Sequence, residues 1–446
     1  MPGLPVITNR RFNSIMPTNQ NSNIPLNSFS VTSSETVGSM VSEGFKSEYP
    51  TEVVSEGQVK VLVPRLSAFV KQPSDYAPSK APVFYNPVME LNRDIAVIAV
   101  QAYQKTLDHE IDVCEPLAAC GIRGIRFAVE VSHVKSLVMN DINHSAYRLL
   151  KKNVDANGLD RLVDVQNEEA NVLLSTHSAP RKRFDVIDID PFGSPVRHLN
   201  SAVQALRNNG LIALTATDMA SLSGVHPRAC LRKYGGRPLR TEYCHELAVR
   251  LLSGCLATIA AKYDLGIRVI FSHRGEHYVR VYAAIVYGAT KADESISRMG
   301  FVLHCFKCFH REIARSSFLL EHNLKCDECG SPLSVAGPLW IGGISESEFC
   351  TKMQEETRRR ELRLSKRIQR NLSLIRDESS GPATYFVIDE ICDKLNLPVP
   401  ATLDVVDSLR DQGFQATPTH FTTRGVRTSA PASIVASIVR NLVANG

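Results

Sequence analysis

Short apolar runs rich in β-branched residues alternate with longer stretches of helical periodicity through the middle of the chain. The runs of strand length are Ile111–Glu115, Ser136–Asn140, Leu162–Gln166, Phe184–Asp188, Gly210–Thr215, Gly266–Phe271 and Val279–Val286. Helical spacing of apolar residues lies between them at Gly124–Glu130, His144–Asn157, Ala170–Ser175, Arg197–Leu206 and Thr241–Asp264. This alternation predicts an α/β fold with a mostly parallel sheet. Only His273–Tyr278 separates the last two strands, which predicts an antiparallel hairpin at one sheet edge.

Upstream of this region the pattern predicts a strand at Gln58–Val63 and an amphipathic helix at Met89–Tyr103. Residues 1–34 contain no Asp, Glu or Lys, and their charges are Arg10 and Arg11. Such a Ser-rich, acid-free segment resembles a mitochondrial or plastid transit peptide, and an ordinary disordered tail is an equal alternative. We expect a disordered leader over residues 1–55. The compartment is intracellular, either nucleus or cytosol, or an organelle if the leader is a transit peptide.

The C-terminal third contains three further segments. A cysteine-paired module covers residues 301–345, and a basic helical stretch follows at 346–376. Beyond the break at Gly381-Pro382, the predicted elements are helices at Tyr385–Leu395 and Ala401–Gln412 and a hairpin formed by Gln415–Phe421 and Gly425–Ser429. Two helices followed by a hairpin are typical of a winged-helix-like α+β domain. We therefore expect a sheet domain over 56–300, a metal module over 301–345 and a C-terminal domain over 346–446.

Length and composition exclude several classes of protein. The chain has 446 residues, of which 43% are hydrophobic and 22% charged, close to ordinary globular usage. Collagen-like, coiled-coil and wholly disordered chains are thereby excluded. No apolar run reaches the roughly 18 residues that a membrane span needs, so we expect no membrane partner, and nothing indicates an obligate protein partner. The formal charge of +5 permits a polyanionic partner without predicting one.

A small-residue loop after the first strand of the sheet suggests a nucleotide-like ligand. The segment 112–127 reads DVCEPLAACGIRGIRF, so a strand ends at Glu115, and Gly121 and Gly124 open a helix where glycine lets the backbone approach a ligand closely. We therefore expect Glu115 and Gly121 to contact the ligand. The carboxyl ends of parallel strands are where such ligands bind. The next strand is followed by Asp141, 20 residues after Gly121, where a carboxylate typically accepts ribose hydroxyls. The alternative for Asp141 is an N-cap of the following helix.

Two further groups lie at this predicted edge of the sheet. Glu169 and Ala170 follow the third strand, where an adenine edge is read, although a helix N-terminus is by itself the better explanation for Glu168 or Glu169. Arg123 in the loop is expected to bind a carboxylate group of the ligand. The alternative is that Arg123 is an ordinary charged residue on the surface.

The fourth strand ends in DPFGSP, residues 190–195. Enzymes that methylate exocyclic amino groups place an Asp/Asn-Pro-Pro-aromatic loop at this point. Asp190 and the Pro191 carbonyl are then expected to accept the amino hydrogens of a base, while Phe192 stacks on its ring. The aromatic residue comes one position early and one proline is missing. In the alternative, Asp190 caps a helix and Phe192 is a core residue.

Four cysteines have the spacing of a metal site. Cys305-x2-Cys308-x17-Cys326-x2-Cys329 falls within the range of a Cys₄ zinc site. Four thiolates close the tetrahedral coordination sphere of Zn²⁺, so the expected ion is structural.

Two basic clusters point to a polyanion. Arg228, Arg232, Lys233, Arg237 and Arg240 follow the DPFG loop in the sequence, and we expect them to bind RNA phosphates. Residues 352–376 carry nine basic against three acidic side chains. This second cluster is either a phosphate-binding surface or a solvated helix face, and the sequence does not decide between them.

Several long blocks carry a resemblance to a known family. They are FYNPVMELNRDIAV (84–97), GIRGIRF (121–127), DIDPFGSP (188–195), TATDMASLSGVHPRACLRKYGG (215–236) and THF-x-x-RG-x-RTSAP (419–431). Together they resemble the tRNA guanine-26 N2-dimethyltransferase family from about residue 58 to the C-terminus. The resemblance implies a Rossmann-like class I methyltransferase sheet over 56–300, S-adenosylmethionine as cofactor, and two successive methyl transfers to N2 of guanine-26. It also implies tRNA as partner, and we expect 346–446, with its basic helix, to be a tRNA-binding domain.

The resemblance also implies roles for single residues. Arg93 and Arg123 match positions that contact the cofactor, and Asp141 matches the ribose ligand. Glu169 and Ala170 match the adenine contact, where the family often has Asp instead of Glu. Asp190 matches the catalytic aspartate. Two other functions stay open from the residues alone: methylation of another base amino group in RNA or DNA, such as adenine N6, and an RNA-binding protein with an inert catalytic domain.

Overall fold

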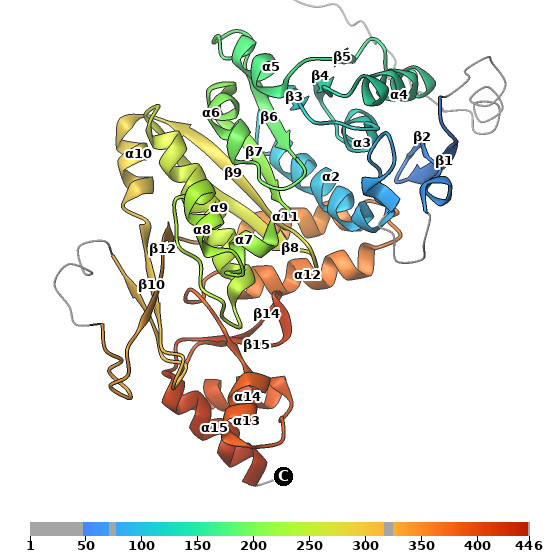
Figure 1. Ribbon diagram of the computed structural model, residues 1–446. Coiled ribbons are helices and arrows are strands. Elements are labelled where there is room, and N and C mark those ends of the chain that lie inside the picture. Colours follow the sequence, from blue (N-terminus) through green and yellow to red (C-terminus); the bar gives the residue numbers. More distant parts are fainter. Residues whose placement is uncertain (1–47, 71–76, 316–323, 445–446) are drawn as a thin grey trace, which may run out of the picture. The chain divides into compact units, whose positions relative to one another are not determined.

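The computed structural model describes residues 48–70, 77–315 and 324–444 (Figure 1). Most of the leader predicted over 1–55 lies outside these residues. Its C-terminal boundary is wrong, because strand β1 (Thr51–Glu56) pairs antiparallel with β2 (Val59–Pro64). The two strands are joined through Gly57, whose φ of +54° suits a tight turn. Residues 51–55 therefore belong to the folded chain.

A seven-stranded sheet with the order β5-β4-β3-β6-β7-β9-β8 forms the centre of the fold. Its strands are β3 (Ile111–Glu115), β4 (Val134–Asn140), β5 (Val163–Gln166), β6 (Phe184–Ile189), β7 (Leu206–Ala216), β8 (Leu265–Arg274) and β9 (Val279–Tyr287). Strands β5, β4, β3, β6 and β7 are mutually parallel, and β9 runs antiparallel to both β7 and β8. The predicted α/β class and the antiparallel edge hairpin are confirmed.

Helices cover both faces of the sheet, because successive strand residues point to opposite sides. Val113 of β3 joins one hydrophobic cluster and its neighbour Cys114 joins another. The first cluster includes α2 (Glu90–Gln104), α3 (Ile122–Glu130) and α4 (His144–Ala156). The second includes α5 (Ala170–Thr176), α6 (Val196–Gln204) and α9 (Cys244–Ala261). Both faces of the sheet are therefore buried, as expected for strands that are apolar along most of their length.

Helix α9 is long and apolar enough to cross a membrane by length and composition, and 78% of it is buried in the fold. It is the central helix of the second cluster and packs on β8. Burial inside the protein therefore accounts for its apolar character. Three shorter helices, α7 (Met219–Leu222), α8 (Pro227–Tyr234) and α10 (Ala289–Ile296), complete this part of the chain.

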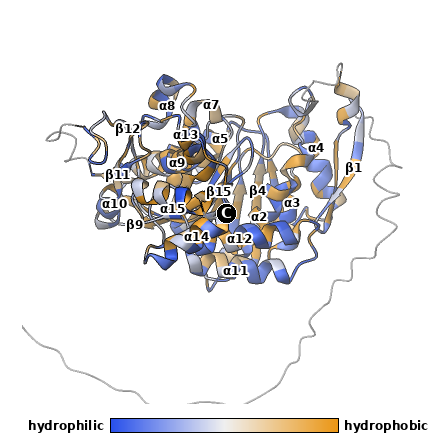
Figure 2. Cartoon of the chain, turned by 90° about the horizontal axis from the view of Figure 1, so that it is seen from below, coloured by the Kyte–Doolittle hydropathy of each residue, from blue (hydrophilic) through white to orange (hydrophobic). Residues whose placement is uncertain are grey.

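The cysteine module is a three-stranded antiparallel sheet of β10 (Met299–His304), β11 (Arg311–Ala314) and β12 (Ser334–Trp340). The basic stretch that follows forms two helices, α11 (Ser347–Arg358) and α12 (Ser365–Glu378). Their apolar residues join the cluster of α2 and the main sheet, so the predicted unit 346–446 is not one packing unit. Figure 2 shows hydrophilic stretches along α11 and α12 (blue), next to the apolar residues that face the core.

The last segment has its own hydrophobic core. It comprises β13 (Phe386–Val387), α13 (Ile388–Leu395), α14 (Thr402–Asp411), β14 (Ala416–Thr419), β15 (Thr422–Thr428) and α15 (Ala432–Ala444). The predicted order of two helices and a hairpin is present, while β13 and α15 were not predicted. The tip of the hairpin is buried, since Phe421 is 1% exposed and joins the core beneath α9.

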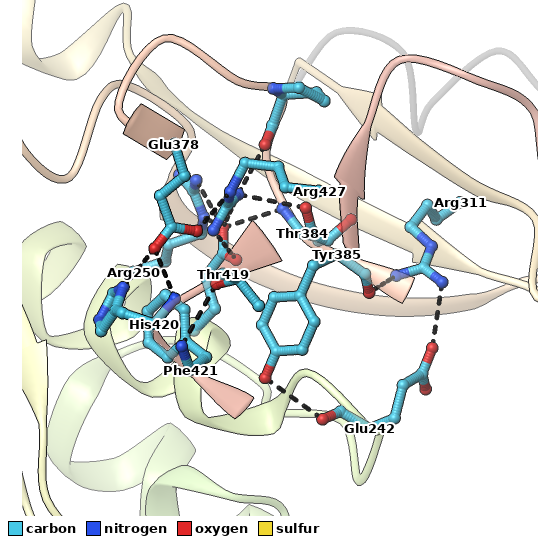
Figure 3. A network of polar contacts seen from close by, with 12 residues as sticks. Glu242, Arg250, Arg311, Glu378, Thr384, Tyr385, Thr419, His420, Phe421 and Arg427 are labelled. Carbon is cyan, nitrogen blue, oxygen red and sulfur yellow. Dashed lines mark hydrogen bonds and ion pairs between the residues drawn. The ribbon is translucent and has the colours of Figure 1, made fainter. Parts of the chain in front are cut away.

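A buried network of charges joins this C-terminal segment to the sheet domain (Figure 3). Arg427 of β15 contacts Glu246 of α9 and Glu378 at the end of α12, each at 2.8 Å. Arg250 contacts the same Glu246 at 2.7 Å. Burial raises the pKa of Glu246, but Arg427 and Arg250 outweigh burial and lower it to about 2. The network thus holds an ionised carboxylate in the protein interior.

Candidate active site

The loops that follow β3, β4 and β5 meet at the carboxyl edge of the parallel strands. Asn140, the last residue of β4, holds these loops together. Its Nδ2 donates to the carbonyls of Pro116 at 2.9 Å and Glu168 at 3.0 Å, and its Oδ1 accepts from the Glu168 N–H at 2.8 Å. A buried side chain therefore sets the position of both flanking loops.

The two glycines of the first loop are required by the fold itself. Gly121 has φ +82°, and a Cβ there would lie 2.1 Å from Leu150 Cδ1. A Cβ on Gly124 would lie 2.4 Å from Met139 Cε. The start of α3 therefore packs directly on the sheet. This packing explains the glycines without the ligand contact that the sequence suggested for them.

Close packing of α3 also brings the Gly124 N–H to the carboxylate of Glu115, at 2.9 Å. Glu115 is buried at the end of β3, and burial raises its pKa to about 8. Its predicted contact with a cofactor stays a prediction, because the observed hydrogen bond is internal.

Asp141 follows β4 and lies at the mouth of the first loop. Its two carboxylate oxygens accept from the backbone N–H groups of Ala119 and Asn143, both at 2.9 Å. Asn143 is the residue that caps α4, so the alternative role of Asp141 as the cap is wrong. Burial raises the pKa of Asp141, and the two backbone hydrogen bonds oppose this effect.

Glu169 and Arg93 both have structural partners. Glu169 is the N-cap of α5 and accepts from the N–H groups of Asn171 at 2.8 Å and Val172 at 3.1 Å, while the adjacent Ala170 is buried. Arg93 is buried and donates to Glu56 at 2.7 Å and to the Asn86 carbonyl at 3.1 Å. The contacts of these residues with a cofactor stay predictions.

Arg123 and Asp190, far apart in the sequence, form an ion pair at the carboxyl end of β6. Arg123 also donates to Asp188 and to the Asn92 Oδ1, each at 2.8 Å. The Asp190 side chain keeps 21% of its surface exposed, while that of Arg123 keeps 5%. Burial raises the pKa of Asp190, but Arg123 and Arg280 outweigh burial and hold it below its ordinary value. Asp190 is thus an ionised carboxylate that is open to solvent on one side.

The residues after Asp190 decide between the two interpretations of this loop. Phe192 is 72% exposed, so it is not a core residue. Its ring meets that of Phe84 edge to face, with centroids 4.5 Å apart. Helix α6 starts only at Val196, and Asp190 does not cap it. The loop therefore carries a partly exposed carboxylate and, two residues further on, an unburied aromatic ring.

Three buried residues behind this loop were not singled out from the sequence. Asp188 contacts Arg123 on one side and Arg280 of β9 on the other. Arg280 also donates to Thr215 of β7. A sequence signal existed, since Asp188 and Arg280 are charged residues inside strands that are mostly apolar.

The four cysteines converge as predicted. Their Sγ atoms all lie within 4.8 Å of one another, with 3.5 Å between Cys305 and Cys329 and 3.4 Å between Cys308 and Cys326. Both Cys-x-x-Cys turns close in the same way, with the residue after the second cysteine donating its N–H to the carbonyl of the first. Those residues, Phe309 and Gly330, both have positive φ. The two Cys-x-x-Cys turns therefore have the same geometry, and together they bring four Sγ atoms to one place.

The first basic cluster is exposed on and after α8. Arg228, Arg232, Arg237 and Arg240 have no acidic partner among the residues that the structure describes. Lys233 is paired with Asp218 at 2.8 Å. Four of the five predicted phosphate contacts are thus available to a ligand.

The second basic cluster is largely occupied by contacts within the protein. Arg359 and Arg360 contact Glu356 at 2.7 and 3.0 Å, Arg363 contacts Glu90, and Arg376 contacts Asp377. An exposed remainder lies on α12, namely Lys366, Arg367 and Arg370. These three have no ion-pair partner within the described part of the chain.

Comparison with known proteins agrees with this geometry. A sequence profile of the family described as N2,N2-dimethylguanosine tRNA methyltransferase matches residues 57–440. The chain is 40% identical over 390 residues to a tRNA (guanine(26)-N(2))-dimethyltransferase of Methanothermobacter thermautotrophicus, covering 87% of this chain and 99% of that protein. It is 36% identical over 385 residues to a tRNA (guanine(26)-N(2)/guanine(27)-N(2))-dimethyltransferase of Aquifex aeolicus, covering 85% and 93%.

One solved structure covers the same extent. It is the complex of Trm1 from Pyrococcus horikoshii with S-adenosyl-L-methionine, which superimposes with a TM-score of 0.75 at 33% sequence identity. The superposition covers 87% of this chain and 99% of that one. Most of the chain therefore has a counterpart of known structure.

Proposed function

Because the chain belongs to the N2,N2-dimethylguanosine tRNA methyltransferase family, we propose that it methylates the exocyclic N2 of guanine-26 in tRNA. S-adenosylmethionine is the methyl donor, and the products are N2-methylguanosine and then N2,N2-dimethylguanosine. The observation that carries the proposal is the loop after β6. It pairs a partly exposed, ionised Asp190 with the unburied ring of Phe192.

The residues at the strand ends fit the cofactor. Arg123 Nε is a buried donor with no acceptor among the described residues, and the methionine carboxylate would supply one. Asp141 offers the carboxylate that ribose hydroxyls require. The adenine would then lie near Glu169 and Ala170, and Arg93 and Glu115 are the other side chains expected to contact the cofactor. When bound, the cofactor supplies a methyl group activated by its sulfonium sulfur.

The protein has to increase the nucleophilicity of the exocyclic amino nitrogen. The amino nitrogen of guanine is conjugated with its ring, so its lone pair is withdrawn. The Asp190 carboxylate and the Pro191 carbonyl accept hydrogen bonds from the amino group and return electron density to nitrogen. The proton that each methyl transfer displaces leaves the nitrogen for the Asp190 carboxylate and then for solvent. Phe192 stacks on the base and fixes the approach of the nitrogen. The lowered pKa of Asp190 keeps the acceptor ionised at neutral pH.

The tRNA contacts follow from the exposed charges. Arg228, Arg232, Arg237 and Arg240 bind phosphates next to the catalytic loop, and the α12 residues Lys366, Arg367 and Arg370 are a second candidate surface. The C-terminal segment 383–446 is different, since it carries six acidic against five basic residues and Arg427 is buried. Its helix α14 exposes Asp404, Asp407 and Asp411. That face repels phosphates, so the segment contacts tRNA through other elements.

The cysteine module supports a structural Zn²⁺ site. The distances between the four Sγ atoms suit thiolates around one tetrahedral ion. All four ligand positions are filled by cysteine, so the site offers no open position for a substrate. Residues 301–345 would then form the metal module of the enzyme, beside the methyl-transfer domain.

The test is a methylation assay with the full chain. Unmodified tRNA is incubated with S-adenosylmethionine, digested, and its nucleosides are weighed by mass spectrometry. N2,N2-dimethylguanosine that disappears with Asp190→Ala supports the proposal. Methyladenosine would instead indicate another base amino group, and tRNA binding without any methylated nucleoside would indicate an inert RNA-binding protein. A transcript with A26 and G27 tells whether the neighbouring guanine is also a substrate.

A further inference from the structure

We propose that Arg280 and Asp188 are positioning residues for methyl transfer, which hold Arg123 and through it Asp190 where the carboxylate meets the substrate amino group. The inference rests on the proposed function and adds residues that touch neither cofactor nor base. It is carried by a line of four side chains of alternating charge. The line runs from β9 across β6 to α3 and ends at the catalytic loop.

The line is continuous in the structure. Arg280 pairs with Asp188 Oδ2, and Arg123 pairs with Asp188 Oδ1 at 2.8 Å. Arg123 then pairs with Asp190. Asp188 therefore bridges two guanidinium groups, and each of its oxygens fixes one of them. Asp190 is the member of the line with the largest exposed surface, which is where a substrate would arrive.

Arg280 is fixed from two strands. Its side chain and that of Asp188 are 0% exposed. Its Nε donates to the Tyr282 hydroxyl at 2.8 Å, its Nη1 donates to Thr215, and the guanidinium lies 4.9 Å from the Tyr282 ring centroid. A buried charge with this many partners has one orientation, so it imposes that orientation on Asp188 and on the groups beyond.

Another buried arginine shows what a purely structural role looks like. Arg250 is 3% exposed, contacts Glu246 at 2.7 Å, and donates to the carbonyls of Trp340 and Gly342 at 3.0 Å. Among the residues that the structure describes, its network leads to Arg427 and does not reach the catalytic loop. Arg250 is therefore the matched control for the loss of a buried guanidinium.

The charges around Asp190 come from several elements, and their signs fix the expected effects. The groups that act on its ionisation are Glu115 from β3, Arg123 from α3, Thr215 from β7, and Arg280 and Tyr278 from the β8–β9 hairpin. Asp188 of β6 lies beyond them and pairs with both arginines. Removing the positive charge of Arg280 makes ionisation of Asp190 harder. Removing the negative charge of Asp188 makes it easier.

The experiment measures single-turnover methylation of tRNA as a function of pH. Arg280→Gln is expected to lower the rate roughly 10- to 100-fold, because a misplaced acceptor costs this much. The acidic limb of its pH–rate profile is expected to move up by roughly one pH unit or more. Arg280→Lys keeps the positive charge but not the geometry of the contact with Asp188. The acidic limb of its pH–rate profile is therefore expected to stay near that of the wild type, while its rate falls. Arg250→Gln leaves the limb unchanged.

Asp188→Asn is the second variant, in case Arg280→Gln does not fold. The acidic limb of its pH–rate profile is expected to move toward lower pH, opposite to the shift in Arg280→Gln. A general loss of stability cannot produce opposite shifts in the two variants. A folded Arg280→Gln or Asp188→Asn with the wild-type rate and limb would overturn the proposal. The wild-type product tests the proposed function separately, since the identity of the methylated base does not depend on these variants.

Discussion

Arg427 on β15 and Glu246 on α9 form a buried ion pair, with 2.8 Å between Nη2 and Oε2, although 181 residues separate them in the chain. The pair joins the C-terminal segment to the sheet domain. Breaking a buried pair on one side leaves the other charge without a partner, which costs about 3–5 kcal/mol. We expect Arg427→Met to lower the free energy of unfolding by that amount, as measured by urea denaturation. A loss below about 1 kcal/mol would show that water reaches the pair.

The same pair makes stability depend on acid. The pKa of Glu246 is about 2 in the folded protein, against an ordinary value of 4.5. Because the folded pKa is depressed, this contribution is complete above pH 4.5 and is lost as the pH falls toward 2. Between pH 6 and pH 3 we expect the wild type to lose about 2 kcal/mol more than Glu246→Gln does. Parallel curves for the two proteins would contradict the assignment.

Phe192 provides a test of base stacking that is separate from stability. Its ring is 72% exposed, so Phe192→Ala should change the free energy of unfolding by no more than about 0.5 kcal/mol. Stacking of a base on an aromatic side chain is worth about 1–3 kcal/mol, so kcat/KM for tRNA should fall roughly 5- to 150-fold. Leu403→Ala, which removes a side chain that is 62% exposed on α14, is the matched control and should keep full activity.

The first basic cluster, on and after α8, should control the salt dependence of tRNA binding. Each phosphate contact adds roughly 0.7–0.9 to the slope of log affinity against log salt concentration. The double variant Arg228→Gln/Arg232→Gln should therefore reduce that slope by roughly 1.4 to 1.8. Lys366→Gln/Arg370→Gln on α12 changes the net charge equally. If only the α12 variant changes the slope, the phosphate surface is on α12 instead.

Metal loss should unfold the cysteine module. Purified protein should contain one Zn²⁺ per chain by elemental analysis, and Cys308→Ser should abolish this. Since metal binding supplies folding free energy, the melting temperature of the variant should fall by several degrees. Cys392→Ser alters a buried thiol of α13 outside the cluster and should retain the metal. Zinc at wild-type stoichiometry in Cys308→Ser would rule out the Cys₄ site.

Local pattern was enough to predict most of the sheet, because its strands are buried on both faces. Strand β3 coincides with the predicted Ile111–Glu115, and β4 to β9 differ by a few residues at their ends. Strand β1 was missed because an acid-free leader was extended too far, over an alternating segment that pairs with β2. The break between α11 and α12 was missed because basic residues continue across it.

The site could be predicted only in part, for a physical reason. Asp190, Phe192 and the cysteines carry their chemistry in short motifs, which a single sequence displays. Arg280 and Asp188 are 92 residues apart, and their pairing depends on the strand order β6-β7-β9. Charged residues inside mostly apolar strands are a sign of buried partners. They do not indicate which partners these are, because that follows from the topology.

The buried tip of the β14–β15 hairpin has a consequence for how the enzyme comes apart. A wing that projects into solvent leaves its domain free to melt alone. Here Phe421 sits in the same core as α9, and Arg427 beside it holds a carboxylate of that helix. The C-terminal segment and the sheet therefore share one cooperative transition, so a calorimetric scan should show a single peak for both. A mutation or truncation in the C-terminal segment would then unfold the sheet domain as well, and the active site with it.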